Sequence, residues 1–229
     1  MRHFVEELER LKSMLLEMSS LVESAIYRSI TAVVQKDESL ANDVLKNEGR
    51  INQIELEIDE FAISLLALQQ PMAADLRFLV ASIKINNDLE RMGDLAVNIA
   101  QRAISLLNEP IVSPMIDIPH IAALVQSMVR KSLDAFVTRD ADLARSVLAS
   151  DDAVDDLRNA SFHELVSFME KDPRNIKQSV DLLSVVRNLE RIADHATNVA
   201  EDVLFLAKGI DVRHHAEERE GNTSISRSR

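Results

Sequence analysis

The sequence has little of what turns, strands and disulfide bridges require. Its 229 residues include no Cys, no Trp, one Tyr, four Gly and five Pro. So few Gly and Pro allow few turns, while the abundant Leu, Ala, Glu and Asp are favoured or tolerated in helices. Val and Ile stand mostly at helical spacing rather than in strand-like runs. These features predict an all-α protein.

The missing residue types and apolar runs also exclude several classes of function. Without Cys there is no disulfide, no thiolate metal site and no cysteine nucleophile. No stretch approaches the roughly 20 apolar residues of a membrane-spanning helix, and the amphipathic start MRHFVEELERLK does not resemble a secretory signal. The net charge of −12 opposes binding to nucleic acid and to anionic lipid. We therefore expect a soluble, cytoplasmic protein that neither binds nucleic acid nor inserts into a membrane.

The chain repeats itself once. Residues 21–48 align with residues 124–151 at a constant offset of 103. LERMGDLAVNIA at 89–100 aligns with LERIADHATNVA at 189–200 at an offset of 100, so one indel of three residues separates the two blocks. Because about a hundred residues recur, the pattern indicates duplication of a domain-sized unit rather than a short solenoid repeat.

Each unit divides into three long helices. Apolar residues at 3–4 spacing mark a stripe through the first stretch, and Lys36-Asp37-Glu38-Ser39 interrupts it, with Asp37 placed to cap the next helix. The later helices are predicted over about 38–69, 71–108, 118–137, 140–170 and 173–208. Long helices joined by short turns must lie antiparallel. The sequence therefore predicts two tandem three-helix bundles with an internal pseudo-twofold axis, over 1–112 and 113–209, and a disordered tail over 210–229.

Acidic residues form a column beside the apolar stripe of the third helix in each unit. Two carboxylates and an amide recur there at a spacing of four: Glu90, Asp94 and Asn98, then Glu190, Asp194 and Asn198. Residues at i and i+4 share one face of a helix. Like charges at this spacing repel by about 0.2–0.5 kcal/mol per pair on an exposed helix, and partial burial raises that cost. A nearby positive charge should therefore offset the repulsion.

Ordinary ion pairs are the simplest source of that positive charge. Arg91, Arg187 and Arg191 each stand three residues before an acid of these columns, which is a favourable spacing on a helix. On this interpretation the acidic columns are solvated, ion-paired helix faces without a bound ion.

A bound cation is the second source, and the preceding helix of each unit favours it. That helix carries Glu48 and Asn52 in the first unit and Asp151 and Asp155 in the second, again four residues apart. Where the two helices meet, three or four oxygen-bearing side chains would converge. Carboxylate and amide oxygens suit hard cations such as Mg²⁺, Mn²⁺, Ca²⁺ or iron.

The duplicated Glu-x-x-x-Asp in the context LERxxDxxxNxA resembles the PhoU family, as does QPMAADLRFLVASIKINNDLERMGD at 70–94. The resemblance covers residues 3–209. It implies a cytoplasmic regulator of phosphate uptake, peripherally associated with membrane complexes and likewise built as two three-helix bundles. It implies two partners, the ATPase subunit (PstB-like) of the phosphate ABC transporter and a sensor histidine kinase (PhoR-like). The resemblance further implies that the protein is a homodimeric adaptor and not an enzyme. When phosphate is plentiful, it would hold the kinase in its non-activating state.

The resemblance also implies multinuclear clusters of divalent or trivalent metal ions, such as Fe, Zn, Mn or Mg. Carried onto this chain, the metal residues are Glu48, Glu90 and Asp94 in the first unit and Asp151, Asp155, Glu190 and Asp194 in the second. Asn52 departs from the pattern, which prefers a carboxylate there. Because a neutral amide oxygen is a weaker ligand, the first site is expected to bind less tightly or to hold fewer ions.

Two alternatives remain beside the adaptor. Carboxylate-bridged di-iron enzymes in helical bundles use Glu-x-x-His, which this chain lacks, and His195 follows Asp194 directly and so turns off the acidic column. No Gly-rich phosphate loop is present either. We therefore predict no catalytic residues and no organic cofactor. The other alternative is a metal-free helical scaffold or chaperone-like protein.

Overall fold

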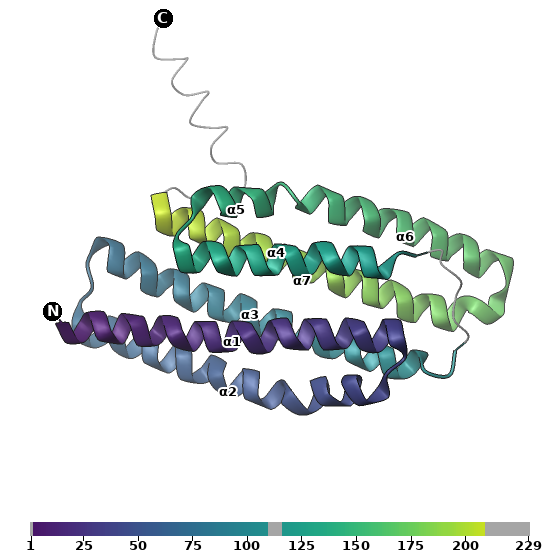
Figure 1. The fold of residues 1–229 in the computed structure, drawn as a ribbon, viewed down its shortest axis with the longest axis horizontal. Helices are drawn as coiled ribbons and strands as arrows, with labels where there is room; N and C mark the ends of the chain where they lie inside the picture. Colours follow the sequence, from purple (N-terminus) through teal and green to yellow (C-terminus); the bar gives the residue numbers. More distant parts are fainter. Residues whose placement is uncertain (1, 110–115, 209–229) are drawn as a thin grey trace, which may run out of the picture.

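All regular structure in the described residues is helical, which confirms the predicted fold class. The computed structural model describes residues 2–109 and 116–208. Their elements are α1 (Arg2–Gln35), α2 (Glu38–Gln69), α3 (Ala73–Leu106), α4 (Ile118–Thr138), α5 (Ala141–Leu148), α6 (Asp151–Lys171), the short 3₁₀ helix η1 (Pro173–Asn175) and α7 (Ile176–Lys208) (Figure 1). The predicted unit boundary at 112/113 and the predicted tail at 210–229 lie outside the described residues.

Equivalent caps start the second helical stretch of each unit. The Asp37 carboxylate accepts hydrogen bonds from the backbone N–H groups of Ser39 and Leu40, at 2.9 and 3.1 Å. Asp140, which is 103 residues further on, accepts the same two bonds at the start of α5. These bonds satisfy backbone donors that a helix start leaves without an intrahelical partner. The cap predicted at Asp37 is confirmed.

The single helix predicted over about 140–170 is wrong, because two helices replace it. α5 ends at Leu148, where the N–H of Ser150 bonds to the carbonyl of Val147 at 2.9 Å, and α6 begins at Asp151. Two acids, Asp151 and Asp152, occupy the first turn of α6, where the helix dipole favours negative charge. Asp151 therefore lies at a helix start, whereas its counterpart Glu48 lies inside the unbroken α2.

The helices form two units side by side, as the repeat predicts. Figure 1 shows α1, α2 and α3 in one half of the molecule and α4 to α7 in the other, all running roughly along the long axis. The broadest contact between any two elements is that of α3 with α7, and α1 also contacts α4. The third helix of each unit therefore lies at the centre of the molecule.

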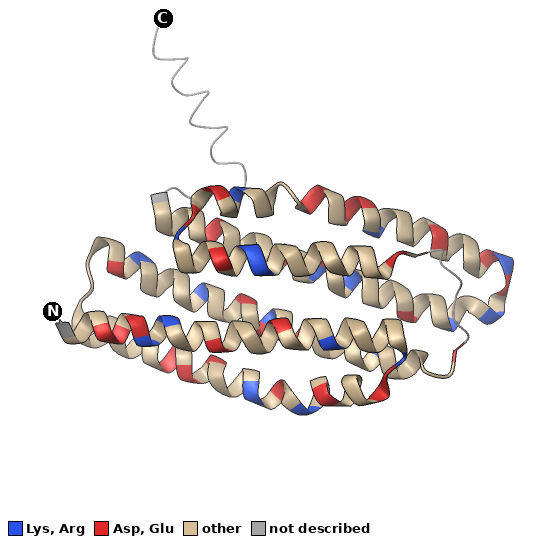
Figure 2. Cartoon of the chain, viewed as in Figure 1, with Lys and Arg blue, Asp and Glu red and all other residues tan. Residues whose placement is uncertain are grey.

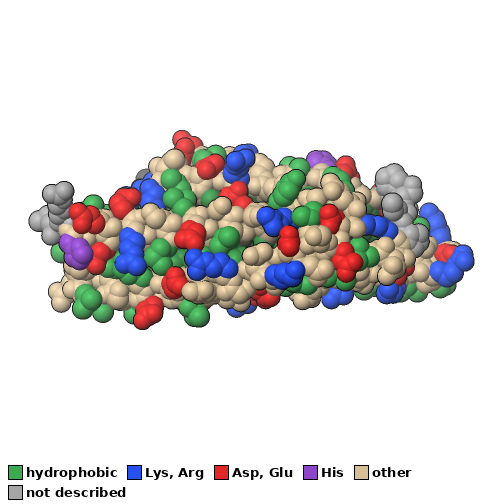
Figure 3. Space-filling view, turned by 60° about the horizontal axis from the view of Figure 1, so that its bottom comes forward, with side chains coloured by type: hydrophobic (Ala, Val, Ile, Leu, Met, Phe, Trp, Pro, Cys, Tyr) green, Lys and Arg blue, Asp and Glu red, His purple; other side chains and the backbone are tan. Residues whose placement is uncertain are grey.

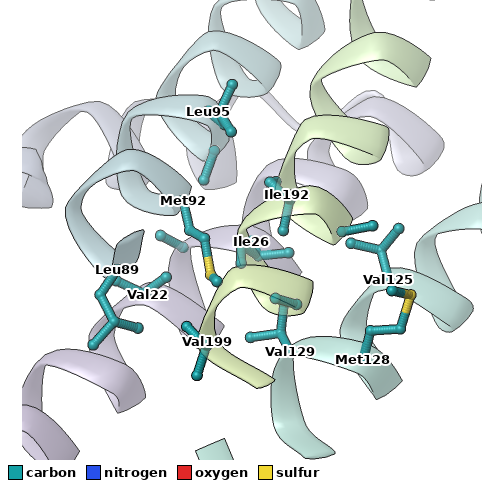
Figure 4. Close-up of a cluster of buried hydrophobic side chains, with 14 of the residues drawn as sticks. Val22, Ile26, Leu89, Met92, Leu95, Val125, Met128, Val129, Ile192 and Val199 are labelled. Atoms are coloured by element: carbon teal, nitrogen blue, oxygen red, sulfur yellow. The ribbon is translucent and has the colours of Figure 1, made fainter. Parts of the chain in front are cut away.

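One apolar core continues through both units. Met92 from α3 and Ile192 from α7 are both fully buried, and they belong to the same cluster as Ile26 from α1 and Val129 from α4 (Figure 4). Burying a side chain of this size stabilises the fold by about 1.5–3 kcal/mol. Because the units share these contacts, we expect them to unfold together.

Two ion pairs of the same polarity connect α3 and α7 at separate places along their contact. The Lys84 ammonium bonds to Asp202 at 2.8 Å, and the Arg102 guanidinium bonds to Asp181 at 3.2 Å. Ser105 also donates to Asp181, at 2.7 Å. The side chains of Asp202 and Asp181 are only 9 % and 7 % exposed. α3 thus supplies both cations and α7 both anions.

This polarity distinguishes the first unit from the second. The repeat offset of 100 relates Arg102 to Asp202, so equivalent positions carry opposite charges. Pairing α3 with a second α3 would bring Lys84 near Arg102, and pairing α7 with a second α7 would bring Asp181 near Asp202. Like charges in contact oppose both arrangements, so the contact favours one first unit against one second unit.

The surface combines charged and apolar side chains. On the face drawn in Figure 3, acidic and basic side chains are interspersed with apolar ones. No helix in the described ranges combines the length and apolar character that crossing a membrane requires.

Candidate functional site

In the second unit, α6 and α7 bring the four predicted acids close enough to affect one another. Partial burial raises the pKa of Asp151, and the nearby Asp194 and Asp155 carboxylates raise it further. Partial burial also raises the pKa of Asp194, with Asp155 as the next cause. The pKa of Glu190 is raised by burial, then by Asp194 and also by Asp155. Acids from two neighbouring helices therefore repel each other here, and Figure 2 marks the acidic residues along α6.

One arginine that sequence reasoning did not single out lies between these acids. Nη2 of Arg158 is 3.0 Å from Oδ1 of Asp155 on its own helix and 3.5 Å from Oε1 of Glu190 on α7. Its positive charge lowers the pKa of Glu190 and of Asp194, although burial and one neighbouring carboxylate have larger opposing effects on each. Arg158 thus offsets part of the repulsion in the second unit.

In the first unit, the α2 acid that acts on the α3 column is Glu55. Partial burial raises the pKa of Glu90, and the carboxylates of Asp94 and Glu55 raise it further. Glu48, which the sequence pattern places in this site, lies two turns away on α2 and lines a small cavity of about 120 Å³ together with Ile51 and Val97. Glu55 therefore lies near Glu90, whereas Glu48 lies beside Val97, which is less than one turn from Asp94 on α3.

Arg91 forms one of the ion pairs that the sequence suggested. Its Nε lies 3.5 Å from Oε2 of Glu90, and its Nη1 lies 4.0 Å from Oδ2 of Asp94. More than half of the Arg91 side chain is exposed, so these contacts are screened by water and contribute little to stability. Ion pairing therefore accounts for part of the local charge balance in the first unit.

A glycine allows α2 to approach α3 closely beside the first site. A Cβ added at Gly93 would lie 3.3 Å from the side chain of Ile51. In the second unit the corresponding residues are Ala193 and Val154, both buried. Relative to the first unit, α7 gains one carbon where alanine replaces glycine, and α6 loses one carbon where valine replaces isoleucine. The combined volume of the pair is therefore unchanged.

The amide predicted at the end of the second column does not belong to it. Nδ2 of Asn198 donates to Oδ1 of Asp88 on α3 at 3.1 Å, and Nδ1 of His195 lies 2.7 Å from the same oxygen. Asn198 therefore serves the contact between the units. The prediction that His195 turns off the column is confirmed. Asp88 was not anticipated, because its partners come from the other unit.

The predicted residues have the oxygen atoms that a hard cation requires, but their side chains are not arranged around a common point. The predicted residues supply only oxygen atoms, mostly from carboxylates, and each site is partly exposed. Within residues 2–109 and 116–208, no three His, Asp or Glu side chains are arranged as a group that could hold a metal ion. Binding would therefore require the carboxylates to turn toward a common point.

Duplicated helical units with acids on facing helices define a class of tandem helical-bundle proteins, and comparison with known proteins makes the class specific. Residues 15–103 and 118–203 each match the model of the PhoU domain. Because these two ranges cover most of the chain, the protein belongs to the PhoU family.

Curated relatives and solved structures agree with this assignment. The chain is 43 % identical over 215 residues to a phosphate-specific transport system accessory protein PhoU homolog of Pseudomonas putida, covering 93 % of this chain and 84 % of the relative. The homolog of Aquifex aeolicus is 41 % identical, with 93 % and 97 % covered.

Two crystal structures match the fold. PhoU from Pseudomonas aeruginosa has a TM-score of 0.88 at 42 % identity, over 90 % of this chain and 100 % of that one. The phosphate transport system regulatory protein PhoU from Streptococcus pneumoniae has a TM-score of 0.85 at 29 % identity, over 91 % and 99 %. These relatives are described as accessory and regulatory proteins, and the family is not one of enzymes.

Proposed function

We propose that this protein is a metal-binding adaptor that restrains phosphate uptake and the phosphate-starvation response. Family membership supports the phosphate system, because the curated relatives are accessory proteins of phosphate-specific transport. The partners we assign are the ATPase subunit of the phosphate ABC transporter and a sensor histidine kinase. We place the protein in the cytoplasm, as a homodimer at the inner face of these membrane complexes.

The observation that carries the metal-binding part is the mutual repulsion of acids from neighbouring helices in each unit. Carboxylates that raise one another's pKa gain most from a shared cation. The residues that would hold it are Glu48, Glu90 and Asp94 in the first unit and Asp151, Asp155, Glu190 and Asp194 in the second. A bound Fe, Zn, Mn or Mg ion would supply positive charge there. The carboxylates would then tie α2 to α3 and α6 to α7, which gives partner proteins a rigid surface.

Elemental analysis of protein purified without a histidine tag tests this proposal. We expect stoichiometric metal in the unaltered protein, and loss of one site's share in Glu90→Ala/Asp94→Ala and in Glu190→Ala/Asp194→Ala. Asp156→Ala is the control, because Asp156 is an exposed acid of α6 that is not among the assigned metal residues. Full metal content in both site variants would refute the ligand assignment. Metal-free protein whose melting is unchanged by chelator would favour the metal-free scaffold.

The partner assignment needs a separate test. We expect the tagged full chain to capture the transporter ATPase and the sensor kinase from membranes of phosphate-replete cells. Capture of neither, in a preparation that retains its helical circular dichroism, would remove the adaptor role without affecting the metal sites.

A further inference from the structure

The two acidic sites differ most at one repeated position. The offset of 103 relates Glu55 on α2 to Arg158 on α6, so the same place carries a negative charge in the first unit and a positive charge in the second. Glu55 interacts electrostatically with Glu90 on α3, and Arg158 forms an ion pair with Glu190 on α7. The charge at this position therefore differs by two between the units, and the exchange of Asn52 for Asp155 one turn earlier offsets one of these charges.

Arg158 occupies the position of a counter-ion in the second site. Its guanidinium contacts Asp155 at 3.0 Å and Glu190 at 3.5 Å, and so joins α6 to α7. Both contacted acids belong to the residues that would hold a cation. A carboxylate engaged with a guanidinium has fewer free lone pairs for a metal ion. Arginine and metal ion therefore compete for the same oxygens.

The contacts of Arg158 are incomplete, and space to leave them is present. Its Nε is buried without a hydrogen-bond partner, so the guanidinium is only partly satisfied where it lies. A cavity of about 470 Å³ adjoins it, lined by Arg158, Phe162, Leu183, Val186, Arg187 and Glu190. The side chain can therefore turn away from Asp155 without displacing the core.

In the first unit, hydrogen bonds between α3 and α2 occupy the position that corresponds to this cavity. Asn86, the counterpart of Val186, is buried and donates to the carbonyl of Glu55 at 3.0 Å and to Oδ1 of Asp59 at 2.9 Å. These bonds hold the turn of α2 that carries Glu55 against α3. The first site thus has an acid, Glu55, on a turn that hydrogen bonds hold in place. The second site has a basic residue, Arg158, whose side chain has room to reorient.

We propose that Arg158 is an internal counter-ion that competes with metal ions for the second site, while Glu55 strengthens the first. This inference rests on the proposed metal binding. It predicts that the first site fills at a lower metal concentration than the second, although Asn52 alone would give the opposite order. The second site then responds to metal over a higher concentration range.

Titration calorimetry with MnCl₂ on the full chain tests the competition. In a Glu90→Ala/Asp94→Ala background, which isolates the second site, Arg158→Gln should raise the affinity for Mn²⁺ by about tenfold, because one competing charge is lost. Arg158→Lys should give a smaller increase. Arg145→Gln is the matched control, because Arg145 pairs with Asp142 at i−3 on the neighbouring α5, away from the site. Circular dichroism melting verifies that each variant is folded.

The first site gives the complementary test. In a Glu190→Ala/Asp194→Ala background, Glu55→Gln should weaken Mn²⁺ binding by about tenfold. Unchanged or weaker binding in folded Arg158→Gln would overturn the role of Arg158 while leaving metal binding intact. If the unaltered protein binds no Mn²⁺ at either site, the proposed metal binding fails, and the competition fails with it.

Discussion

The first and second units share a common plan of helix packing but not the same charges. Inside the units, the buried pairs Ile51/Gly93 and Val154/Ala193 exchange one carbon and conserve volume. At the acidic sites the compensation is only partial, since Asn52 and Glu55 in the first unit correspond to Asp155 and Arg158 in the second, which leaves the second unit more positive by one charge at these positions. Packing constrains volume tightly, whereas a partly exposed site tolerates changes of charge. The difference shows that the units are not interchangeable.

Reversing a charge between the units should have the largest effect. Lys84→Glu places a second negative charge against Asp202, whose side chain is 9 % exposed, and we expect a loss of about 3 kcal/mol in the free energy of unfolding. Arg102→Glu should act in the same direction on Asp181. Urea denaturation of the full chain measures both.

The exchanged pair Lys84→Glu/Asp202→Lys is the control for this prediction, and it should recover most of the lost stability. A double variant as unstable as Lys84→Glu alone would show that charge complementarity between α3 and α7 does not determine stability at this pair.

The pH dependence of stability should be the next largest effect. A carboxyl group whose folded-state pKa is raised binds more protons in the folded than in the unfolded chain between its two pKa values. Its contribution is therefore fully present below the unfolded-state value and is lost as pH rises through the folded one. In chelator, we expect these groups to make the protein more stable near about pH 5 than at pH 7.

The two units should contribute unequally to that slope. At the sites, raised pKa values are found for Asp151, Glu190 and Asp194 in the second unit and for Glu55 and Glu90 in the first. Asp194→Asn should flatten the dependence, measured by urea denaturation in buffers between pH 5 and 7. A slope that is unchanged in this variant would mean that the site acids do not set it.

The smallest effect should come from copying the packing of the second unit into the first. Ile51→Val alone should lower the free energy of unfolding by about 1 kcal/mol. Adding Gly93→Ala should recover that loss, because the added methyl fills the space and alanine is favoured over glycine in a helix by about 1 kcal/mol. Thermal melting distinguishes the two variants. A double variant less stable than Ile51→Val alone would contradict the exchange of volume.

The fold followed from the sequence wherever a local signal decided it. Apolar spacing and the cap at Asp37 located α1 and α2. The break before α6 was missed because Ser150-Asp151-Asp152, a favourable helix start, lies within a continuous apolar pattern. The repeat itself gives no sign of the break, because the corresponding stretch of α2 is continuous.

The site was predictable on each helix but not between helices. Spacing of four located Glu190 and Asp194 on one face, and the acids of α6 do reach them. The register of α2 against α3 depends on packing such as that of Ile51 on Gly93, so sequence alone could not show that Glu55 acts on Glu90. The correspondence of Glu55 and Arg158 across the repeat is the sequence feature that could have revealed both residues. Asp88 had none, because its partners lie in the other unit.

Anomalous diffraction from crystals of the full chain grown with Mn²⁺ tests the central claim most directly, that adjacent helices in each unit hold a cation between their acids. We expect one metal position, or one cluster, between α2 and α3 against Glu90 and Asp94, and another between α6 and α7 against Glu190 and Asp194. Manganese found only away from these carboxylates, with Glu90 and Glu190 bound to no metal at saturating Mn²⁺, would contradict it.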